Sequence, residues 1–308
     1  MRSIGRATAL GSGSRFGSPA THWLVVVIAL AALVLLFFNK LAFSNLILAR
    51  GDTFLYFYPY WAAAAEALRA GRVPLWNSDI FMGAPMLANS QVGFFYPLNW
   101  PVWLLLPTPY AVSASILIHL LIAGLGTYLA GRWAMGLSRA AALFAAALFA
   151  LGGYLTAQVE HINQLQGLAW LPWYFAVLAP VIVAGDGVRG WRAVASGALG
   201  VGILFALQLL AGHTQTAFIS GVAISLWALF HWPAGGQTEK RGVGPLVRVG
   251  LVIGAGVALA ALLAAVQLLP TLELAGQSSR QGGLSLNEVL SFSWHPLHLT
   301  RALLPAYG

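Results

Sequence analysis

Long apolar runs limit what this chain can fold into more than any other feature of its sequence. The first extends from Trp23 to Phe38 without a charged residue, and comparable runs follow it along the chain. A hydrocarbon core about 30 Å thick needs about 20 apolar residues in a helix, because backbone groups inside it must pair within the segment. The sequence therefore predicts membrane-spanning helices at approximately 23–38, 110–130, 140–157, 165–184, 193–211, 216–232 and 249–269.

Composition supports the same class. Hydrophobic residues make up 59% of the 308 residues and charged residues only 8%, whereas soluble domains carry about 25% charged residues. The net charge of +8 does not indicate nucleic-acid binding, because Lys and Arg are scattered singly and build no basic face. The absence of cysteine excludes disulfides and cysteine nucleophiles. We predict an all-α polytopic membrane protein with about seven spans.

Charge distribution predicts how the chain is divided by the membrane. Residues 1–21 are expected to be a flexible cytoplasmic tail, residues 22–270 a transmembrane bundle, and residues 271–308 an extracytoplasmic segment that is truncated. Ten of the sixteen Lys and Arg residues lie in the tail and in loops on its side of the membrane, which predicts an N-terminus inside. The long helical loop at 44–100 then becomes the first extracytoplasmic loop.

This loop holds three of the eight acidic residues, namely Asp52, Glu66 and Asp79. Asp52 can act as a general base for a hydroxyl or bind a cation, but it can equally cap a helix. The spacing of Glu66 and Arg69 predicts a solvated ion pair. Asp79 lies in a turn-rich stretch, where it is either a substrate ligand or a partner for backbone groups.

Three smaller polar islands are predicted on the same side of the membrane. Glu160 and His161 end the third run, and such an ionisable pair indicates function unless it is a plain solvated loop. His213 and Gln215 separate two runs with almost no loop, so they either face a wet cavity or form a short turn. Arg280 could bind a phosphate through two hydrogen bonds.

Motifs for other chemistries are missing. His295 and His298 have helical spacing, but Pro296 disturbs a helix there and no HExxH pattern occurs. GxSxG is absent as well. We therefore predict no metal site and no serine-hydrolase triad.

Four segments in order resemble the YfhO-like bacterial membrane proteins of the GT-C glycosyltransferase superfamily: GDTFLYFYPYW, PLWNSDIFMGAPMLANSQVGFFYPLNW, AGHTQTAF and QLLPTLELAGQSSR. The resemblance implies a multi-pass enzyme of the bacterial cytoplasmic membrane. It implies transfer of a sugar from a polyprenyl-phosphate carrier to a hydroxyl of a cell-envelope polymer, glycolipid or protein, on the extracytoplasmic face. Asp52 matches the base in the first outer loop. The residues expected to bind substrate are Asp79, Glu160, His161, His213, Gln215 and Arg280.

The chain departs from that family in two respects. Many GT-C enzymes carry paired acidic residues in this loop, whereas Asp52 has no adjacent carboxylate, so a divalent cation is the weaker expectation and no cofactor is firmly implied. Family members are also usually longer. Interrupted spans at Pro172 and 212–215 leave a transporter or flippase of lipid-linked sugars as an alternative, and a non-catalytic membrane scaffold is another.

Overall fold

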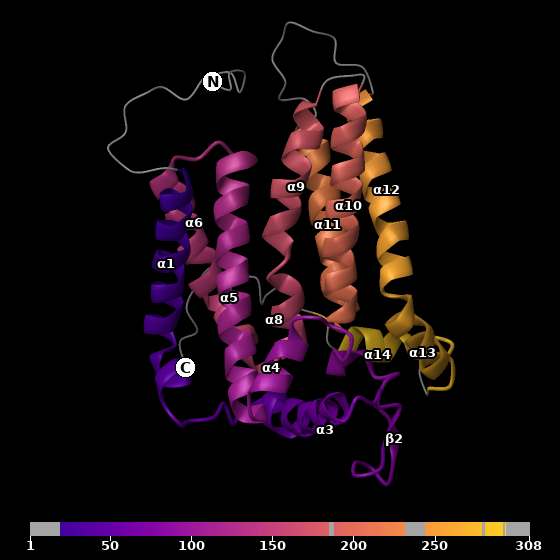
Figure 1. Cartoon of the computed structure of the whole chain (residues 1–308). Helices are drawn as coiled ribbons and strands as arrows, with labels where there is room; N and C mark the ends of the chain where they lie inside the picture. The colour runs from indigo at the N-terminus through magenta and orange to yellow at the C-terminus, as the bar shows by residue number, and fades with distance from the viewer. Residues whose placement is uncertain (1–18, 185–187, 232–243, 279–280, 292, 294–308) are drawn as a thin grey trace, which may run out of the picture.

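The computed structural model describes most of the chain, namely residues 19–184, 188–231, 244–278, 281–291 and 293. The regular structure of these residues is almost entirely helical (Figure 1), and the one sheet among them is a short antiparallel pair, β1 (Trp76–Asn77) and β2 (Ala84–Pro85). Six stretches are long and apolar enough to cross a membrane: Ala20–Phe37, Thr108–Trp133, Arg139–Glu160, Ile162–Val183, Gly190–Leu210 and Leu246–Leu263. The predicted all-helical membrane class is confirmed, and the predicted sixth span is a shorter apolar helix, Thr214–Phe230.

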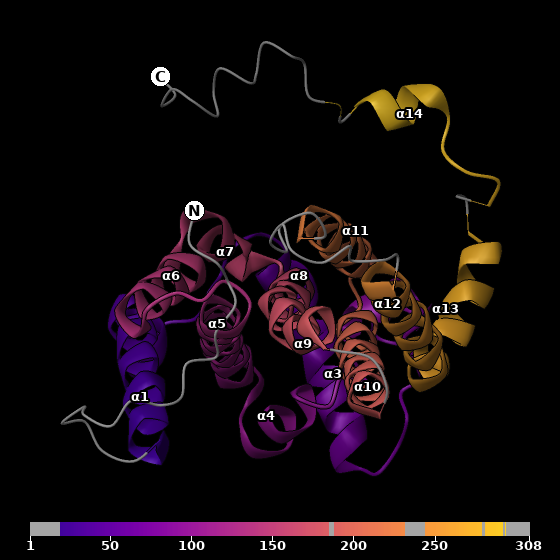
Figure 2. The ribbon, with the colours of Figure 1, turned by 90° about the horizontal axis from the view of Figure 1, so that it is seen from above.

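The long helices are α1 (Pro19–Phe37), α5 (Thr108–Trp133), α6 (Arg139–Leu151), α9 (Leu171–Val183), α10 (Val188–Leu210), α11 (Thr214–His231) and α12 (Gly244–Leu263). Seen along their axes, α1, α5 and α6 form one group and α9 to α12 another (Figure 2). Within the first group, a Cβ on Gly131 would lie 3.3 Å from the Cβ of Ala142, so small residues let α5 and α6 approach closely. Trp173 joins the groups by donating to the Ile122 carbonyl at 3.0 Å.

Two predicted spans are interrupted. The fourth is divided into α8 (Ile162–Leu168) and α9, with Pro172 in the first turn of α9, where its missing N–H is not needed. It therefore begins a helix instead of kinking one. The seventh ends at Leu263, and a separate helix, α13 (Ala265–Gly276), follows. Gln267 of α13 donates to the Leu87 carbonyl at 2.8 Å, so this helix turns to contact the loop at 44–100.

The predicted outer loop closes one end of the bundle, which we call the loop end (Figure 1). The elements that gather there are α2 (Asn39–Phe43), the π-helical turn η1 (Thr53–Phe57), α3 (Tyr58–Arg69), η2 (Ser90–Val92), α4 (Asn99–Leu105), α7 (Gly153–Ala157) and η3 (Gln158–Glu160). The short helix α14 (Leu286–Ser291) stands apart from the bundle (Figure 2). Trp61 and Trp103 are fully buried between α3 and α4, with their rings edge to face and 5.3 Å apart. The aromatic residues of this loop therefore build a core of its own.

The prediction of an ion pair between Glu66 and Arg69 is wrong. The Arg69 guanidinium instead donates to the carbonyls of Trp103 at 2.5 Å and Leu106 at 2.9 Å. The last carbonyls of a helix have no partner within it and attract a cation. Arg69 therefore joins the end of α3 to the end of α4.

Candidate functional site

Four of the residues predicted to form a site come together at the loop end. We call them the edge cluster: Asp52, Glu160, His161 and His213. They derive from the start of the long loop, from η3 and its following residue, and from the turn between α10 and α11. Arg280, a further candidate, lies outside the described residues. The convergence follows from helix directions, because each of these segments is reached at the same end of the bundle (Figure 1).

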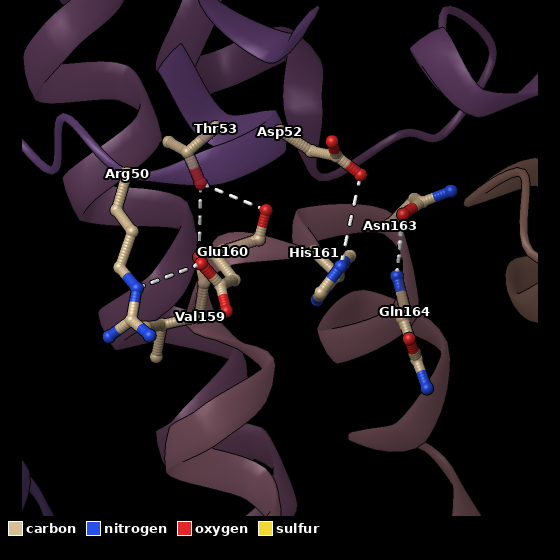
Figure 3. A network of polar contacts seen from close by, with 8 residues as sticks. All are labelled: Arg50, Asp52, Thr53, Val159, Glu160, His161, Asn163 and Gln164. Carbon is tan, nitrogen blue, oxygen red and sulfur yellow. Dashed lines mark hydrogen bonds and ion pairs between the residues drawn. The ribbon is translucent and has the colours of Figure 1, made fainter. Parts of the chain in front are cut away.

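Two side-chain contacts, from Thr53 and Arg50, hold the start of the loop against η3 (Figure 3). Thr53, which is fully buried, donates from Oγ1 to the Glu160 carbonyl at 3.0 Å. Arg50 Nε lies 3.3 Å from Glu160 Oε2. Gly51 has φ +49, and a Cβ there would lie 2.9 Å from the same carboxylate oxygen. The left-handed backbone favours glycine at this position, and a Cβ would also displace the end of the flexible Glu160 side chain.

The Asp52 side chain is left available. It precedes the π-helical turn η1 but makes no capping hydrogen bond, so the alternative role as a side-chain cap does not apply. The side chain is 63% exposed, and its Oδ2 lies 3.8 Å from His161 Nε2. Single π-helical turns inside α-helices occur frequently at functional sites. Asp52 is thus a carboxylate on a fixed backbone, facing solvent and an imidazole.

The two histidines complete the edge cluster. His161 Nδ1 is buried and has no hydrogen-bond partner among the described residues. His213 bonds through Nδ1 to the Thr216 hydroxyl. Burial lowers the pKa of His213, and the neighbouring His161 lowers this pKa further. A ring with a lowered pKa stays neutral near pH 7 and can donate a hydrogen bond from one nitrogen.

A close backbone approach brings the α10–α11 turn to this position. Gly212 has φ +85, and a Cβ on it would collide with the Ser90 carbonyl. On the other side, Asn163 of α8 donates to the Gly212 carbonyl at 3.5 Å. The turn is therefore held between η2 and α8, which places His213 next to the segment that carries His161.

Tyr56 is a neighbour of the edge cluster that the sequence analysis missed. It stacks on Tyr60 with ring centroids 4.4 Å apart. Burial raises the pKa of Tyr56, with Tyr60 and Asp52 adding to the rise and Asn89 opposing it. The phenol therefore stays protonated and can serve as a donor. The signal that could have found it is its position four residues after Asp52, on the same face of a helix.

Two predicted ligands do not join the edge cluster. Asp79 is exposed in the turn between β1 and β2, where its N–H donates to Asn77 Oδ1 at 2.9 Å and its carboxylate accepts from Ser78 at 3.1 Å. Asp79 therefore lies in a turn, and its carboxylate contacts the Ser78 side chain and not a backbone group. Gln215 is exposed in the first turn of α11.

A second polar group lies inside the bundle and also escaped the sequence analysis. We call it the buried network: Tyr96, Asn99, Ser115, His119 and Gln166. Gln166 donates to Asn99 Oδ1 at 2.6 Å and to Ser115 Oγ at 3.0 Å. The Tyr96 hydroxyl lies 2.7 Å from His119 Nε2 and accepts from Trp170 at 2.9 Å. These contacts join α8, which begins directly after His161, to α5 and to the loop.

The edge cluster can take a proton from a hydroxyl and can hydrogen-bond an anion. Within the described parts of the chain, no three His, Asp or Glu side chains gather closely enough to hold a metal ion. Comparison of the chain with models of protein families, with curated proteins and with solved structures finds no match. The functional argument therefore rests on the geometry of the site.

Proposed function

We propose that this chain is a membrane glycosyltransferase of the GT-C type, related to the YfhO-like proteins. It transfers a sugar from a polyprenyl-phosphate carrier to a hydroxyl of a cell-envelope acceptor. The observation that carries the proposal is Asp52, an exposed carboxylate that caps no helix, on a backbone fixed by Gly51 and Thr53, and 3.8 Å from His161. A general base needs this combination of access and fixed position.

The proposed topology has seven spans, with α11 added to the six longer stretches, and the N-terminus inside a bacterial cytoplasmic membrane. Arg132 at the end of α5, Arg139 at the start of α6 and Arg192 near the start of α10 lie at the end of the bundle opposite the loop end. Positive residues in short loops favour the cytoplasmic side. The edge cluster then faces the extracytoplasmic side, where lipid-linked sugars would be used.

The proposed reaction is a single displacement. The acceptor oxygen forms a bond to the anomeric carbon while its proton passes to Asp52. The bond between that carbon and the carrier phosphate breaks, and its electron pair leaves with the phosphate oxygen. Donors must stabilise this developing charge. His161 and His213 are the candidates in the edge cluster, and Arg280 and Gln215 remain predicted ligands. Glu160 is engaged with Arg50 and is assigned to positioning.

The test is transfer by the Asp52→Asn variant in membranes supplied with a radiolabelled polyprenyl-phosphate sugar. Asparagine keeps the size and shape of the side chain, but it replaces one carboxylate oxygen by an NH₂ group and cannot accept the proton. We expect labelled product to fall by about 10²–10⁴-fold, the usual contribution of a general base. Asp79→Asn is the matched control, because it makes the same change in the same loop away from the edge cluster. Transfer that is equal in the two variants would remove Asp52 as the base.

A transporter of lipid-linked sugars is the second candidate, since α8 and α9 form an interrupted span. Ion-coupled transporters use the free backbone groups of such breaks. In this chain Gln208 fills the break by donating to the Gly167 carbonyl at 2.9 Å and to Ser220 at 2.8 Å. A backbone carbonyl at the break is thus already paired, and we prefer the transferase.

A further inference from the structure

A pocket of about 400 Å³ lies at the loop end, between the end of α1, the segment that follows α2, and η3. Its wall residues are apolar except for Asn39 and Lys40. The Asn39 amide is already used, since it donates to the Leu36 carbonyl at 2.8 Å. Six of the wall residues are Phe38, Lys40, Leu41, Ile47, Leu48 and Val159. The pocket therefore offers an apolar surface and one ammonium group.

The pocket lies at the level where two membrane spans end. The stretch Ala20–Phe37 ends three residues before Lys40, and the stretch Arg139–Glu160 ends one residue after Val159. On the open side, the wall residue Leu46 is 62% exposed. A site at the ends of two spans meets the boundary between the hydrocarbon core and the headgroups of a bilayer. The pocket is therefore placed to contact a lipid molecule at that boundary.

The charge at the rim of the pocket is positive. Lys40 is exposed and forms no ion pair with any of the described residues. The Arg50 side chain, which follows the wall residue Leu48 by two positions, is 80% exposed although its Nε pairs with Glu160. Basic pockets beside membrane helices bind anionic lipid headgroups. The combination of an apolar wall with a cationic rim suits an anionic phospholipid better than a zwitterionic one.

This pocket is separate from the position of the proposed sugar transfer. In Figure 3, Arg50 and Val159 lie to one side of Glu160, and Asp52 and His161 lie to the other. The two ion pairs, Arg50 with Glu160 and His161 with Asp52, follow the same division. A phosphate bound at the pocket rim is therefore separated from Asp52 by the Arg50–Glu160 pair, so the pocket does not present a sugar donor to the base.

We propose that the pocket binds one anionic glycerophospholipid of the bilayer, with its phosphate at Lys40 and the upper part of an acyl chain along the apolar wall. The proposed topology places this lipid in the outer leaflet, and the proposal rests on no part of the proposed chemistry. It identifies a lipid that is bound and not consumed.

Binding at this position has a consequence for the loop end. The pocket wall combines Leu48 of the long loop with Val159 of η3. The same two segments are joined by Thr53, whose hydroxyl donates to the Glu160 carbonyl at 3.0 Å. A ligand that binds only the folded arrangement stabilises it. The phospholipid is therefore expected to hold the start of the loop against η3.

The experiment uses the full chain in phosphatidylcholine nanodiscs that contain a trace of phosphatidylglycerol with a diazirine near the glycerol end of one acyl chain. After irradiation, the labelled peptides are identified by mass spectrometry. We expect label on the peptides that contain residues 46–48 and 159. Unlabelled phosphatidylglycerol should remove the label, whereas phosphatidylcholine with the same acyl chains should not. Added salt should weaken the labelling, because it screens exposed charges.

Charge variants supply the matched comparison. Lys40→Gln should reduce labelling of the pocket about fivefold, the usual contribution of one lysine near an anionic membrane surface, and Lys40→Arg should retain it. Arg72→Gln is the control, because Arg72 is an exposed cation of the same loop outside the pocket wall. Phosphatidylglycerol should also raise the unfolding midpoint of wild type and Arg72→Gln more than that of Lys40→Gln.

Equal labelling of Lys40→Gln and wild type would overturn the assignment, as would label confined to other parts of the chain. Competition by phosphatidylcholine as strong as by phosphatidylglycerol would show that the headgroup is not recognised. Stronger competition by polyprenyl phosphate would assign the pocket to the donor lipid, and displacement by inorganic phosphate at matched ionic strength would assign it to a free anion. Pocket labelling in a chain that transfers no sugar would contradict only the proposed function, whereas transfer without pocket labelling would contradict only this inference.

Discussion

The edge cluster and the buried network contain similar polar side chains, but these side chains differ in burial and in hydrogen-bond pairing. In the buried network, Asn99, His119 and Gln166 are at most 1% exposed, and their polar atoms pair with one another or with backbone groups. In the edge cluster, the Asp52 side chain is 63% exposed, and His161 Nδ1 has no hydrogen-bond partner in the part of the chain that the structure describes. Gln166 of the buried network lies on α8, and His161 of the edge cluster is the residue directly before that helix.

This difference in pairing indicates which region stabilises the fold and which region can carry out chemistry. A buried polar group costs free energy unless it is paired, and a fully paired network defines one arrangement of its helices. A group that must exchange a proton or bind substrate needs at least one hydrogen-bonding position that no protein group occupies. The buried network is therefore expected to hold α8 in place, and the edge cluster is expected to use that placement.

The largest expected effect on stability comes from breaking the buried network with Gln166→Leu. The change leaves Asn99 Oδ1 and Ser115 Oγ without their donor, which costs about 1–3 kcal/mol for each buried group left unpaired. Thermal unfolding in detergent should show a lower midpoint. Gln164→Leu on the same helix is the control, because within the described residues the Gln164 side chain makes only a 3.4 Å contact to Tyr154. Equal midpoints would show that the network does not stabilise the bundle.

The second largest effect on stability is expected from a change at Gly51, in the backbone next to Asp52. Gly51→Ala combines a left-handed conformation, worth about 1–2 kcal/mol in a residue with a Cβ, with displacement of the Glu160 carboxylate that pairs with Arg50. Gly71→Ala has the same sign of φ, at +66, but its Cβ would meet nothing within 4 Å. We expect Gly51→Ala to unfold at a lower temperature than Gly71→Ala, and only Gly51→Ala to impair transfer. Matching behaviour of the two variants would refute the role of the close contact.

Thr53→Val tests the hydrogen bond from Thr53 to the Glu160 carbonyl, which joins the loop to η3. Valine preserves the shape but leaves the Glu160 carbonyl without the threonine donor, which should cost about 1 kcal/mol. Thr127→Val is a matched control, since its hydroxyl bonds the Ala123 carbonyl within its own helix at 2.8 Å. Unfolding midpoints and transfer should both fall for Thr53→Val only. A loss of stability with unaltered transfer would show that Thr53 does not position Asp52.

The smallest effect is a dependence of stability on pH. Because burial lowers the pKa of His213 in the folded chain, the unfolded state binds its proton more readily, and stability decreases as pH falls below the ordinary value of 6.5. His213→Gln should flatten this part of the curve of unfolding midpoint against pH. An unchanged slope between wild type and variant would contradict the lowered pKa.

Sequence patterns predict the helical parts of this fold because membrane spans depend on local length and hydrophobicity. They also place Asp52, Glu160, His161 and His213 at one end, since successive helices alternate in direction. They do not predict contacts between distant segments, such as Thr53 with the Glu160 carbonyl or Gly212 against Ser90. His119 and Gln166 were missed because each stands in a largely apolar stretch, and Arg69 was mispaired because the free carbonyls of α4 are not visible in a sequence.

The most direct measurement compares Asp52→Asn with wild type in one reconstituted preparation, recording both the unfolding midpoint and the rate of transfer from a radiolabelled polyprenyl-phosphate sugar. Because the Asp52 side chain is exposed and caps no helix, we predict an unchanged midpoint with transfer reduced by about 10²-fold or more. Transfer at the wild-type rate would contradict the account, and so would a loss of transfer that is matched by a lower unfolding midpoint.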